Sequence, residues 1–240
     1  MEWFSAWFNS PYYHILYKNR DFKEAEIFID SLINKLRFNT HQRFLDLACG
    51  KGRHATYLNS KGFEVVGLDI APESILEANK NANSTLSFAV HDMREPLPEQ
   101  GKFDFILNLF TSFGYFENDI ENVKTMQEIK NGLKQNGVLV LDFMNTEKVI
   151  KDLVANEVKI VDGVTFNISR SVENGFIIKR INFSDNGQDY NFEERVGALT
   201  LYEFQHYFKT AGMTIQALYG NYALDNFDIT NSPRMIFVVK

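Results

Sequence analysis

Residues 44–55 read FLDLACGKGRHA, and residues 67–70 read GLDI. The first stretch begins as an apolar run, and then Gly50 and Gly52 allow the chain to turn sharply out of a buried strand. Such a turn, followed by a helix, directs backbone N–H groups toward a ligand. Asp69 ends the next apolar run, where a carboxylate can accept hydrogen bonds from both hydroxyls of a ribose. The segment therefore predicts a site for a ligand that carries a nucleoside.

The chain around this segment alternates between short apolar runs and helical stretches. The runs are FLDLA, EVVGLD, LSFAV, FDFILNL and VLVLDF, with helices from about Arg53, after Pro72 and from Asp119. Runs that are nearly continuously apolar are typical of parallel strands covered by helices on both faces. A helix near 201–211 and strands near 213–218 and 235–239 continue the pattern. We therefore expect an α/β fold with a doubly wound, mostly parallel, seven-stranded sheet.

A segment of different rhythm interrupts this pattern after the fifth strand. Within residues 156–197, apolar and polar residues alternate, and Asn174-Gly175 and Asn186-Gly187 each separate two extended stretches. Asn-Gly between extended stretches is a strong hairpin signal. The segment predicts an inserted three-stranded antiparallel meander.

We expect residues 1–240 to form one domain. Its parts would be a helical cover (1–38), a ligand-binding core (39–150), the meander as a lid (156–197) and a return to the core sheet (198–240). Within the cover, residues 21–38 have the pattern of an amphipathic helix, with Asp21 as its cap and Glu24 completing a capping box.

Composition excludes several classes of protein. The 31 acidic and 25 basic side chains give a net charge of −6, so there is no cationic excess to hold a nucleic acid backbone. The single cysteine, Cys49, cannot form an internal disulfide or a cysteine-based metal cluster. No apolar stretch approaches the roughly 20 residues of a membrane span. We expect a cytoplasmic protein without a metal, and its oligomeric state stays open.

The motif D-x-x-x-G-x-G at Asp46, Gly50 and Gly52 resembles the cofactor loop of the class I S-adenosylmethionine-dependent methyltransferases. The resemblance covers residues 40–145 most strongly. It implies a Rossmann-like methyltransferase fold and S-adenosyl-L-methionine as the cofactor. The residues it assigns to the cofactor are Asp46, Ala48, Gly50 and Gly52 in the loop, Asp69 and Ile70 at the ribose, Asp92 and Met93 at the adenine, and Asn108 along the methionine part.

Three further stretches are similar to small-molecule N-methyltransferases that act on amino sugars and glycine. These are YYHILY at 12–17, DMR at 92–94 and SFGY at 112–115. In such relatives the N-terminal aromatic segment closes over the cofactor, so Tyr13 and Arg20 are candidates for binding it. The alternative is that the tyrosines only pack a helix face and Arg20 is solvated.

The resemblance implies methyl transfer to a small molecule, at nitrogen or oxygen, by in-line displacement. Such a reaction depends mainly on holding two groups in near-attack geometry away from water. Candidates for contact with the acceptor are Tyr17, Phe110, Ser112 and Tyr115. His14, His91 and His206 are conceivable bases and equally conceivable structural residues. Asp142, which ends the fifth strand, either faces the ligand or caps the exit of the chain.

Two alternatives stay open. One is a regulatory module that binds S-adenosylmethionine without catalysis, because no catalytic residue can be named. The other is an NAD(P)-dependent oxidoreductase, although Ala55 occupies the place of the third glycine of a dinucleotide site.

Overall fold

The computed structural model describes residues 7–18 and 22–240, so the roles expected of Arg20 and Asp21 lie outside the described residues. Within these residues the strands form two sheets, one of seven strands and one of four. The order in the larger sheet is β3-β2-β1-β4-β5-β11-β10. Its strands are β1 (Arg43–Leu47), β2 (Glu64–Asp69), β3 (Leu86–Val90), β4 (Phe103–Asn108), β5 (Leu133–Met144), β10 (Ile215–Tyr219) and β11 (Arg234–Val239).

The larger sheet is mostly parallel, as the sequence predicts. Strand β1 pairs in parallel with β2 and β4, and β11 runs antiparallel to its neighbours β5 and β10. The chain order reverses at β1, where the sheet is built outward in both directions. Ligands of such sheets bind outside the carboxyl ends of the strands at this point. The residues that end β1, β2 and β4 therefore lie where a ligand of such a sheet binds.

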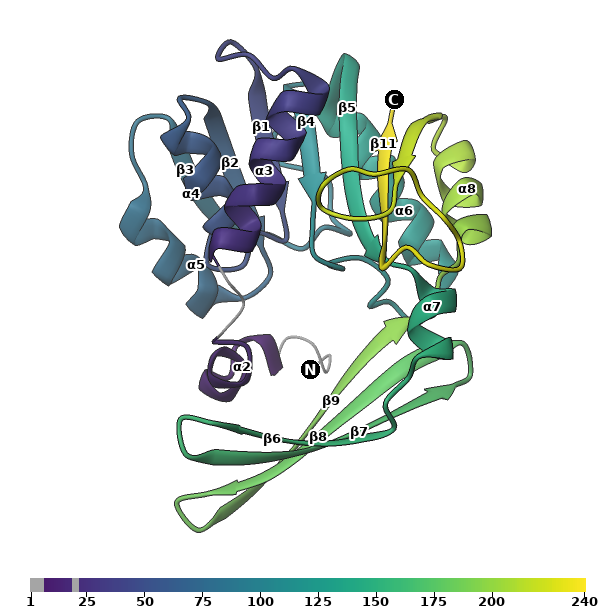
Figure 1. The fold of residues 1–240 in the computed structure, drawn as a ribbon. Coiled ribbons are helices and arrows are strands. Elements are labelled where there is room, and N and C mark those ends of the chain that lie inside the picture. The colour runs from purple at the N-terminus through teal and green to yellow at the C-terminus, as the bar shows by residue number, and fades with distance from the viewer. Residues whose placement is uncertain (1–6, 19–21) are drawn as a thin grey trace.

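Helices cover both faces of this sheet, and their bounds follow the predicted pattern. One face packs against α3 (Phe22–Leu36), α4 (Arg53–Ser60) and α5 (Pro72–Ala78), and the other against α6 (Asp119–Gly132) and α8 (Leu201–Thr210). Capping fixes where α6 and α8 begin. The Asn118 side chain accepts a hydrogen bond from Glu121 N, and Thr200 forms a capping box with Glu203. The result is a three-layer sandwich (Figure 1).

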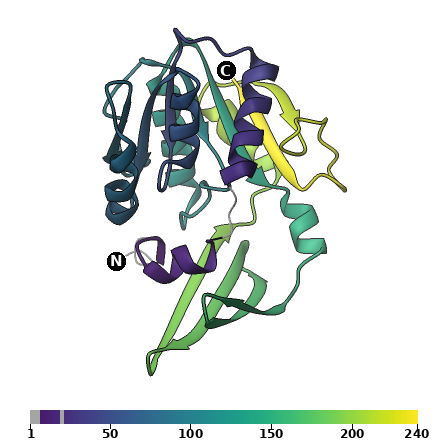
Figure 2. The ribbon, with the colours of Figure 1, turned by 60° about the vertical axis from the view of Figure 1, so that its left-hand side comes forward.

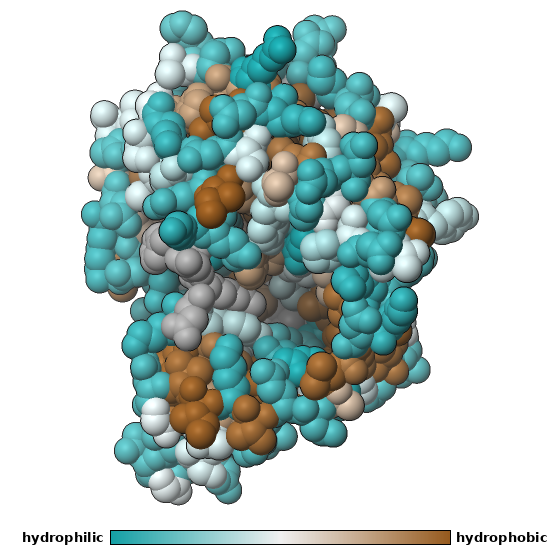
Figure 3. Space-filling view, in the orientation of Figure 1, coloured by the Kyte–Doolittle hydropathy of each residue, from teal (hydrophilic) through white to brown (hydrophobic). Residues whose placement is uncertain are grey.

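The inserted segment has four strands, so the prediction of three is wrong. They are β6 (Asn156–Val161), β7 (Val164–Glu173), β8 (Phe176–Asp185) and β9 (Gln188–Gly197), each antiparallel to the next. The additional turn is Asp162-Gly163, where both residues have positive φ (48° and 82°), as a two-residue hairpin turn requires. Strand β6 alternates in sequence, with Val158 and Ile160 on either side of Lys159, but both apolar side chains are exposed on this edge strand. Figure 3 shows apolar side chains at the surface of this lower sheet.

Two short helices connect the sheets. Helix α7 (Thr146–Lys151), which the sequence pattern does not predict, leads from β5 to β6. Helix α2 (Pro11–Leu16) lies between the large sheet and the small one in both ribbon views (Figures 1 and 2). Trp7 and Leu16 pack with Phe166 and Ile181 in a separate apolar core beneath the main one. The N-terminal segment is thus fastened to the inserted sheet.

None of the helices in residues 7–18 and 22–240 combines the length and the hydropathy needed to cross a lipid bilayer.

Candidate active site

A cavity of about 670 Å³ lies where the carboxyl ends of the parallel strands face α2 and the inserted sheet. Its volume is within the usual range of small-molecule sites. Of the residues predicted from sequence, the cavity wall includes Tyr13, Tyr17, Ala48, Gly50, Asp69, Ile70, Asp92, Met93, Phe110, Ser112 and Tyr115. Asp46, Gly52 and Asn108 are not part of this wall, but they support the loop and the strand ends that form it.

Asp46 supports the loop instead of facing the cavity. Its side chain is 1% exposed, and its Oδ2 accepts a hydrogen bond from Ala55 N at 3.1 Å. Burial raises the pKa of Asp46 to about 7. Asp46 thereby ties the end of β1 to the first turn of α4.

Gly52 is required by space as well as by backbone conformation. Its φ is +76°, and a Cβ at this position would lie 2.6 Å from Phe88 Cε1. Gly50 also has a positive φ, but a Cβ there meets no atom within 4 Å. The loop can therefore approach β3 closely only if residue 52 is glycine, whereas at residue 50 the requirement is conformational.

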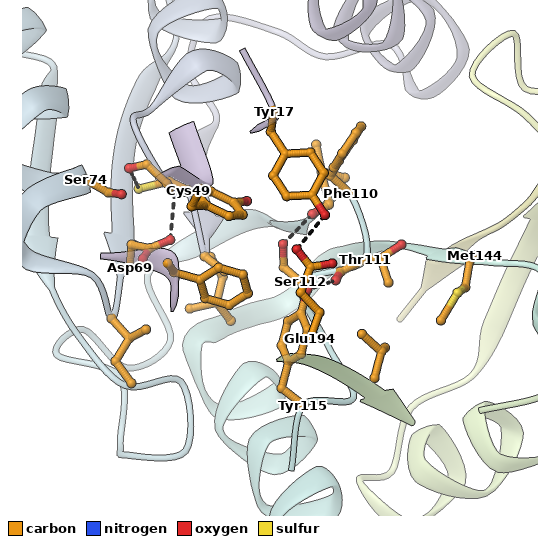
Figure 4. Close-up of a pocket in the computed structure, with 18 of the residues that line it drawn as sticks. Tyr17, Cys49, Asp69, Ser74, Phe110, Thr111, Ser112, Tyr115, Met144 and Glu194 are labelled. Carbon is orange, nitrogen blue, oxygen red and sulfur yellow. Dashed lines mark hydrogen bonds between the residues drawn. The ribbon is translucent and has the colours of Figure 1, made fainter. Parts of the chain in front are cut away.

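Asp69 is both a loop anchor and a cavity residue. Its Oδ2 accepts a hydrogen bond from Gly50 N at 2.7 Å (Figure 4), and its Oδ1 accepts one from Ala71 N at 2.9 Å. Burial raises the pKa of Asp69, although these backbone hydrogen bonds oppose the shift. A carboxylate has about four acceptor positions, so two such bonds leave capacity for ligand hydroxyls.

Asp92 is oriented by Arg94. The Arg94 Nη2 donates to Asp92 Oδ2 at 2.6 Å, and Arg94 Nη1 donates to Glu121 Oε1 at 2.9 Å. Burial acts to raise the pKa of Asp92, but the hydrogen bonds and charge of Arg94 outweigh it and hold the pKa below its usual range. Asp92 is thus a fixed anionic acceptor on the wall beside Met93.

Asn108 is completely buried and joins two strands. Its Nδ2 donates to Leu47 O at 3.1 Å. Since its side chain is turned toward β1, the part of β4 that lines the cavity is Leu109 and the residues that follow it.

The turn after β4 has a strained backbone. Phe110 and Thr111 have φ values of 64° and 60°, a conformation that costs free energy in residues other than glycine. The Asp142 Oδ2 accepts from Phe110 N at 2.8 Å, and Arg234 Nη2 donates to Thr111 Oγ1 at 2.9 Å. Asp142 is 1% exposed and is not part of the cavity wall, so it does not face the ligand. Its carboxylate holds the turn after β4 and not the exit of its own strand, so neither interpretation of the sequence is correct.

The hydroxyl groups of the same turn bond to nearby backbone. Ser112 Oγ donates to Leu109 O at 2.7 Å, and Tyr115 Oη donates to Thr111 O at 2.6 Å. Both side chains line the cavity, with Tyr115 entering from the side of the inserted sheet in Figure 4. They shape the wall while keeping the turn closed.

Only two of the three candidate bases lie at the cavity. His14 and His91 line the cavity, whereas His206 lies on α8, outside the cavity wall. Burial lowers the pKa of His14 to about 4, with a smaller contribution from the charge of Lys51. His14 is therefore neutral at pH 7.

The wall includes charged residues that sequence reasoning missed. Lys179 and Glu194 come from β8 and β9, and Arg53 stacks over the Phe110 ring at 4.5 Å from its centroid. Tyr17 Oη donates to Glu194 Oε1 at 2.5 Å (Figure 4). For Lys179 a sequence signal was present. Ile177, Lys179 and Ile181 share one face of a strand, so the pattern places a charge on an otherwise apolar face.

The described residues contain no group of three or more His, Cys, Asp or Glu side chains arranged to hold a metal ion.

The profile of a methyltransferase domain family matches residues 38–197. The chain belongs to this family. The match spans the loop, Asp69, Asp92 and the inserted sheet, and it decides against the nicotinamide-dependent alternative.

Similar proteins include two named methyltransferases. A glycine/sarcosine N-methyltransferase of Aphanothece halophytica is 31% identical over 137 residues, covering 55% of this chain and 50% of that protein. A dTDP-3-amino-3,4,6-trideoxy-alpha-D-glucopyranose N,N-dimethyltransferase of Streptomyces venezuelae is 26% identical over 185 residues, covering 73% and 77%. The chain spans about half the length of several curated relatives that it matches.

The fold is shared with solved methyltransferase structures. An S-adenosylmethionine-dependent methyltransferase from Clostridium acetobutylicum superposes with a TM-score of 0.80 at 21% identity, covering 95% of both chains. The Rossmann-like methyltransferase fold expected from the sequence is confirmed.

Proposed function

We propose that this methyltransferase-family protein transfers a methyl group from S-adenosyl-L-methionine to a small-molecule acceptor at nitrogen or oxygen. The observation that carries the proposal is the hydrogen bond from Gly50 N to Asp69 on the wall of a cavity large enough for a small molecule. It joins the glycine loop to the carboxylate that the family resemblance assigns to the ribose.

The residues present fit this cofactor. The loop at Ala48 and Gly50 brings backbone close to the cavity, Asp69 offers acceptor positions for two hydroxyls, and Asp92 offers a fixed acceptor near Met93 for an adenine amino group. Phe110 and Tyr13 line the wall with aromatic rings. When bound, the cofactor supplies an activated methyl group on a sulfonium, which needs no covalent help from the protein.

The work left to this chain is positioning and exclusion of water. The turn at Phe110 and Thr111, held by Asp142, fixes the rim of the cavity after β4. We propose that residues 1–38 act as a cover and 156–197 as a lid on the core of residues 39–150, with 198–240 completing the sheet. In support, Trp7 and Tyr17 pack against the inserted sheet.

The acceptor is proposed to be a small molecule and the location cytoplasmic. A net charge of −6 disfavours nucleic acid as a partner, and a single cysteine is typical of reducing compartments. In support, the names of the two relatives give small molecules as acceptors, glycine and sarcosine for one and a dTDP-linked amino sugar for the other.

Calorimetric titration with S-adenosylhomocysteine tests the proposal. The protein should bind it, and Asp69→Ala should weaken binding by about 2 kcal/mol or more, roughly thirtyfold, because charge-assisted hydrogen bonds are lost. Asp152→Ala, at the exposed aspartate that follows α7 and pairs with Lys148, is the matched control and should bind as the wild type does. A folded wild-type protein that does not bind would refute the proposal.

A further inference from the structure

One row of charged side chains crosses the cavity face of β7, β8 and β9. Strand register places Arg170 opposite Lys179, and Lys179 opposite Glu194. The adjoining rows on the same face are apolar, with Ile168, Ile181 and Phe192 on one side and Val172, Ile177 and Val196 on the other. All three charged side chains line the cavity. Arg170 pairs with Glu157 and Lys179 with Glu194, so the row presents held charges, within an otherwise apolar face, to this side of the cavity.

Glu194 is the most constrained member of the row. Its Oε1 accepts hydrogen bonds from Trp7 Nε1 at 2.8 Å and from Tyr17 Oη at 2.5 Å. Its Oε2 lies 3.5 Å from Lys179 Nζ, and the Glu194 side chain is only 17% exposed. Two of these donors, Trp7 and Tyr17, come from the N-terminal segment.

Lys179 sets the direction of the phenol hydrogen. Lys179 Nζ donates a hydrogen bond to Tyr17 Oη. Since a phenol has one hydrogen, the Tyr17 hydrogen is directed at Glu194 and not elsewhere. The chain Lys179 to Tyr17 to Glu194 therefore holds a carboxylate at a fixed place, facing the same cavity as Asp69 (Figure 4).

We propose that Glu194, held by Tyr17 and Trp7 and flanked by Lys179, is the acceptor subsite, and that the group it takes is an amine. This inference rests on the proposed function. A carboxylate attracts an acceptor group that carries or develops positive charge, as an amine does. A small amine binds as an ammonium at neutral pH, and it attacks with its lone pair after that ammonium has released one proton to water.

The charge balance of the reaction explains why a carboxylate belongs there. The acceptor nitrogen forms the N–C bond with its lone pair while the S–C bond breaks and its electron pair stays on sulfur. Positive charge thus moves from sulfur to nitrogen, and the proton on nitrogen is then released to water. A fixed carboxylate beside the nitrogen stabilises the charge that develops there in the transition state. Glu194 would also accept the N–H hydrogen bond that aims the lone pair at the methyl group.

The test measures binding of a small amine by tryptophan fluorescence. Trp7 donates to Glu194, and the only other tryptophan in the sequence is Trp3, so a Trp3→Phe background isolates the reporter. The probes are propylamine, propionate and propan-1-ol, which have similar size and different charge, each titrated with S-adenosylhomocysteine present. Of the three probes, propylamine should bind most tightly and give the strongest saturable change in Trp7 fluorescence. Tighter binding of propionate or propan-1-ol, or no saturable response to propylamine, would overturn the inference.

Variants assign the effect to Glu194. Glu194→Gln should weaken propylamine binding about tenfold or more. Lys179→Met removes a neighbouring cation, while Trp7 and Tyr17 still donate to Glu194 Oε1, so this variant should bind propylamine at least as tightly as the wild type. Weaker binding in both variants would indicate a distorted sheet and would overturn the inference, because opposite responses are required.

A matched control comes from the adjacent residue. Glu193→Gln removes the same charge from the same strand, but Glu193 lies opposite Arg180, is half-exposed and is not part of the cavity wall. It should leave propylamine binding unchanged. Calorimetry with S-adenosylhomocysteine on each variant separates the two proposals. If the wild type does not bind S-adenosylhomocysteine, the proposed function is refuted. If all variants bind S-adenosylhomocysteine normally and Glu194→Gln binds propylamine as tightly as the wild type, only this inference is refuted.

Discussion

Arg234 Nε lies 2.7 Å from Asp142 Oδ1, and this buried ion pair joins the last strand of the sheet to the strand that precedes the insertion. The Asp142 side chain is 0% exposed, and its other oxygen accepts hydrogen bonds from Phe110 N and Tyr222 Oη. One carboxylate therefore connects β5, β11 and the strained turn after β4. The rim of the cavity depends on residues far apart in the sequence.

Breaking this pair should destabilise the protein strongly. Asp142→Ala leaves the Arg234 guanidinium buried without its carboxylate, a change that typically costs 3–5 kcal/mol. We expect the free energy of unfolding, measured by urea denaturation with circular dichroism, to fall by about 3 kcal/mol or more. Asp152→Ala, at an exposed pair, should change it by less than about 0.5 kcal/mol. Equal effects of the two variants would contradict the role given to Asp142.

Gly52 and Gly187 have nearly equal φ, so comparing alanine substitutions at the two positions isolates the steric cost of a Cβ at residue 52. Gly52 (φ +76°) faces Phe88, whereas Gly187 (φ +77°) in the β8–β9 turn has open space at its Cβ position. Alanine at either position incurs a similar conformational cost of about 1 kcal/mol. Gly52→Ala should lose a further 1–3 kcal/mol or so by overpacking against the Phe88 ring. Denaturation curves that show the same loss for both variants would rule out the close approach of loop and strand.

Asp46 makes stability depend on pH in a direction that can be checked. Its pKa is about 7 in the folded protein, against roughly 3.9 in an unfolded chain. Between these values the folded state binds more protons, so this group lowers stability as pH rises. Asp46→Asn removes that dependence.

The stability of Asp46→Asn relative to wild type should therefore increase by roughly 1.4 kcal/mol per pH unit from about pH 4 to pH 7. Urea denaturation of both proteins across this range measures the difference. A constant difference, or one of the opposite sign, would show that burial does not raise the pKa of Asp46.

The core of the fold could be predicted because its signals are local. The five apolar runs and the resuming strands correspond to the observed strands of the large sheet, since parallel strands buried on both faces have continuous apolar sequences. An antiparallel insertion was predicted, but its first turn was missed, although Asp162-Gly163 is a hairpin signal of the same kind as Asn-Gly. Helix α7 has only six residues, too few for a periodic pattern.

The candidate site could be predicted in part. The loop and Asp69 are recognisable because they lie within one βαβ unit. Glu194 and Asp142 could not be assigned, because their roles depend on partners as distant as Trp7, 187 residues away, and Arg234, 92 residues away. Spacing along the chain does not encode such contacts.

The structure of the protein crystallised with S-adenosylhomocysteine tests the central claim most directly. We expect electron density for the nucleoside in the cavity, with its ribose hydroxyls on the Asp69 carboxylate and its adenine near Asp92. Density for the ligand away from Asp69, or a cavity that stays empty at a concentration that saturates binding, would contradict it.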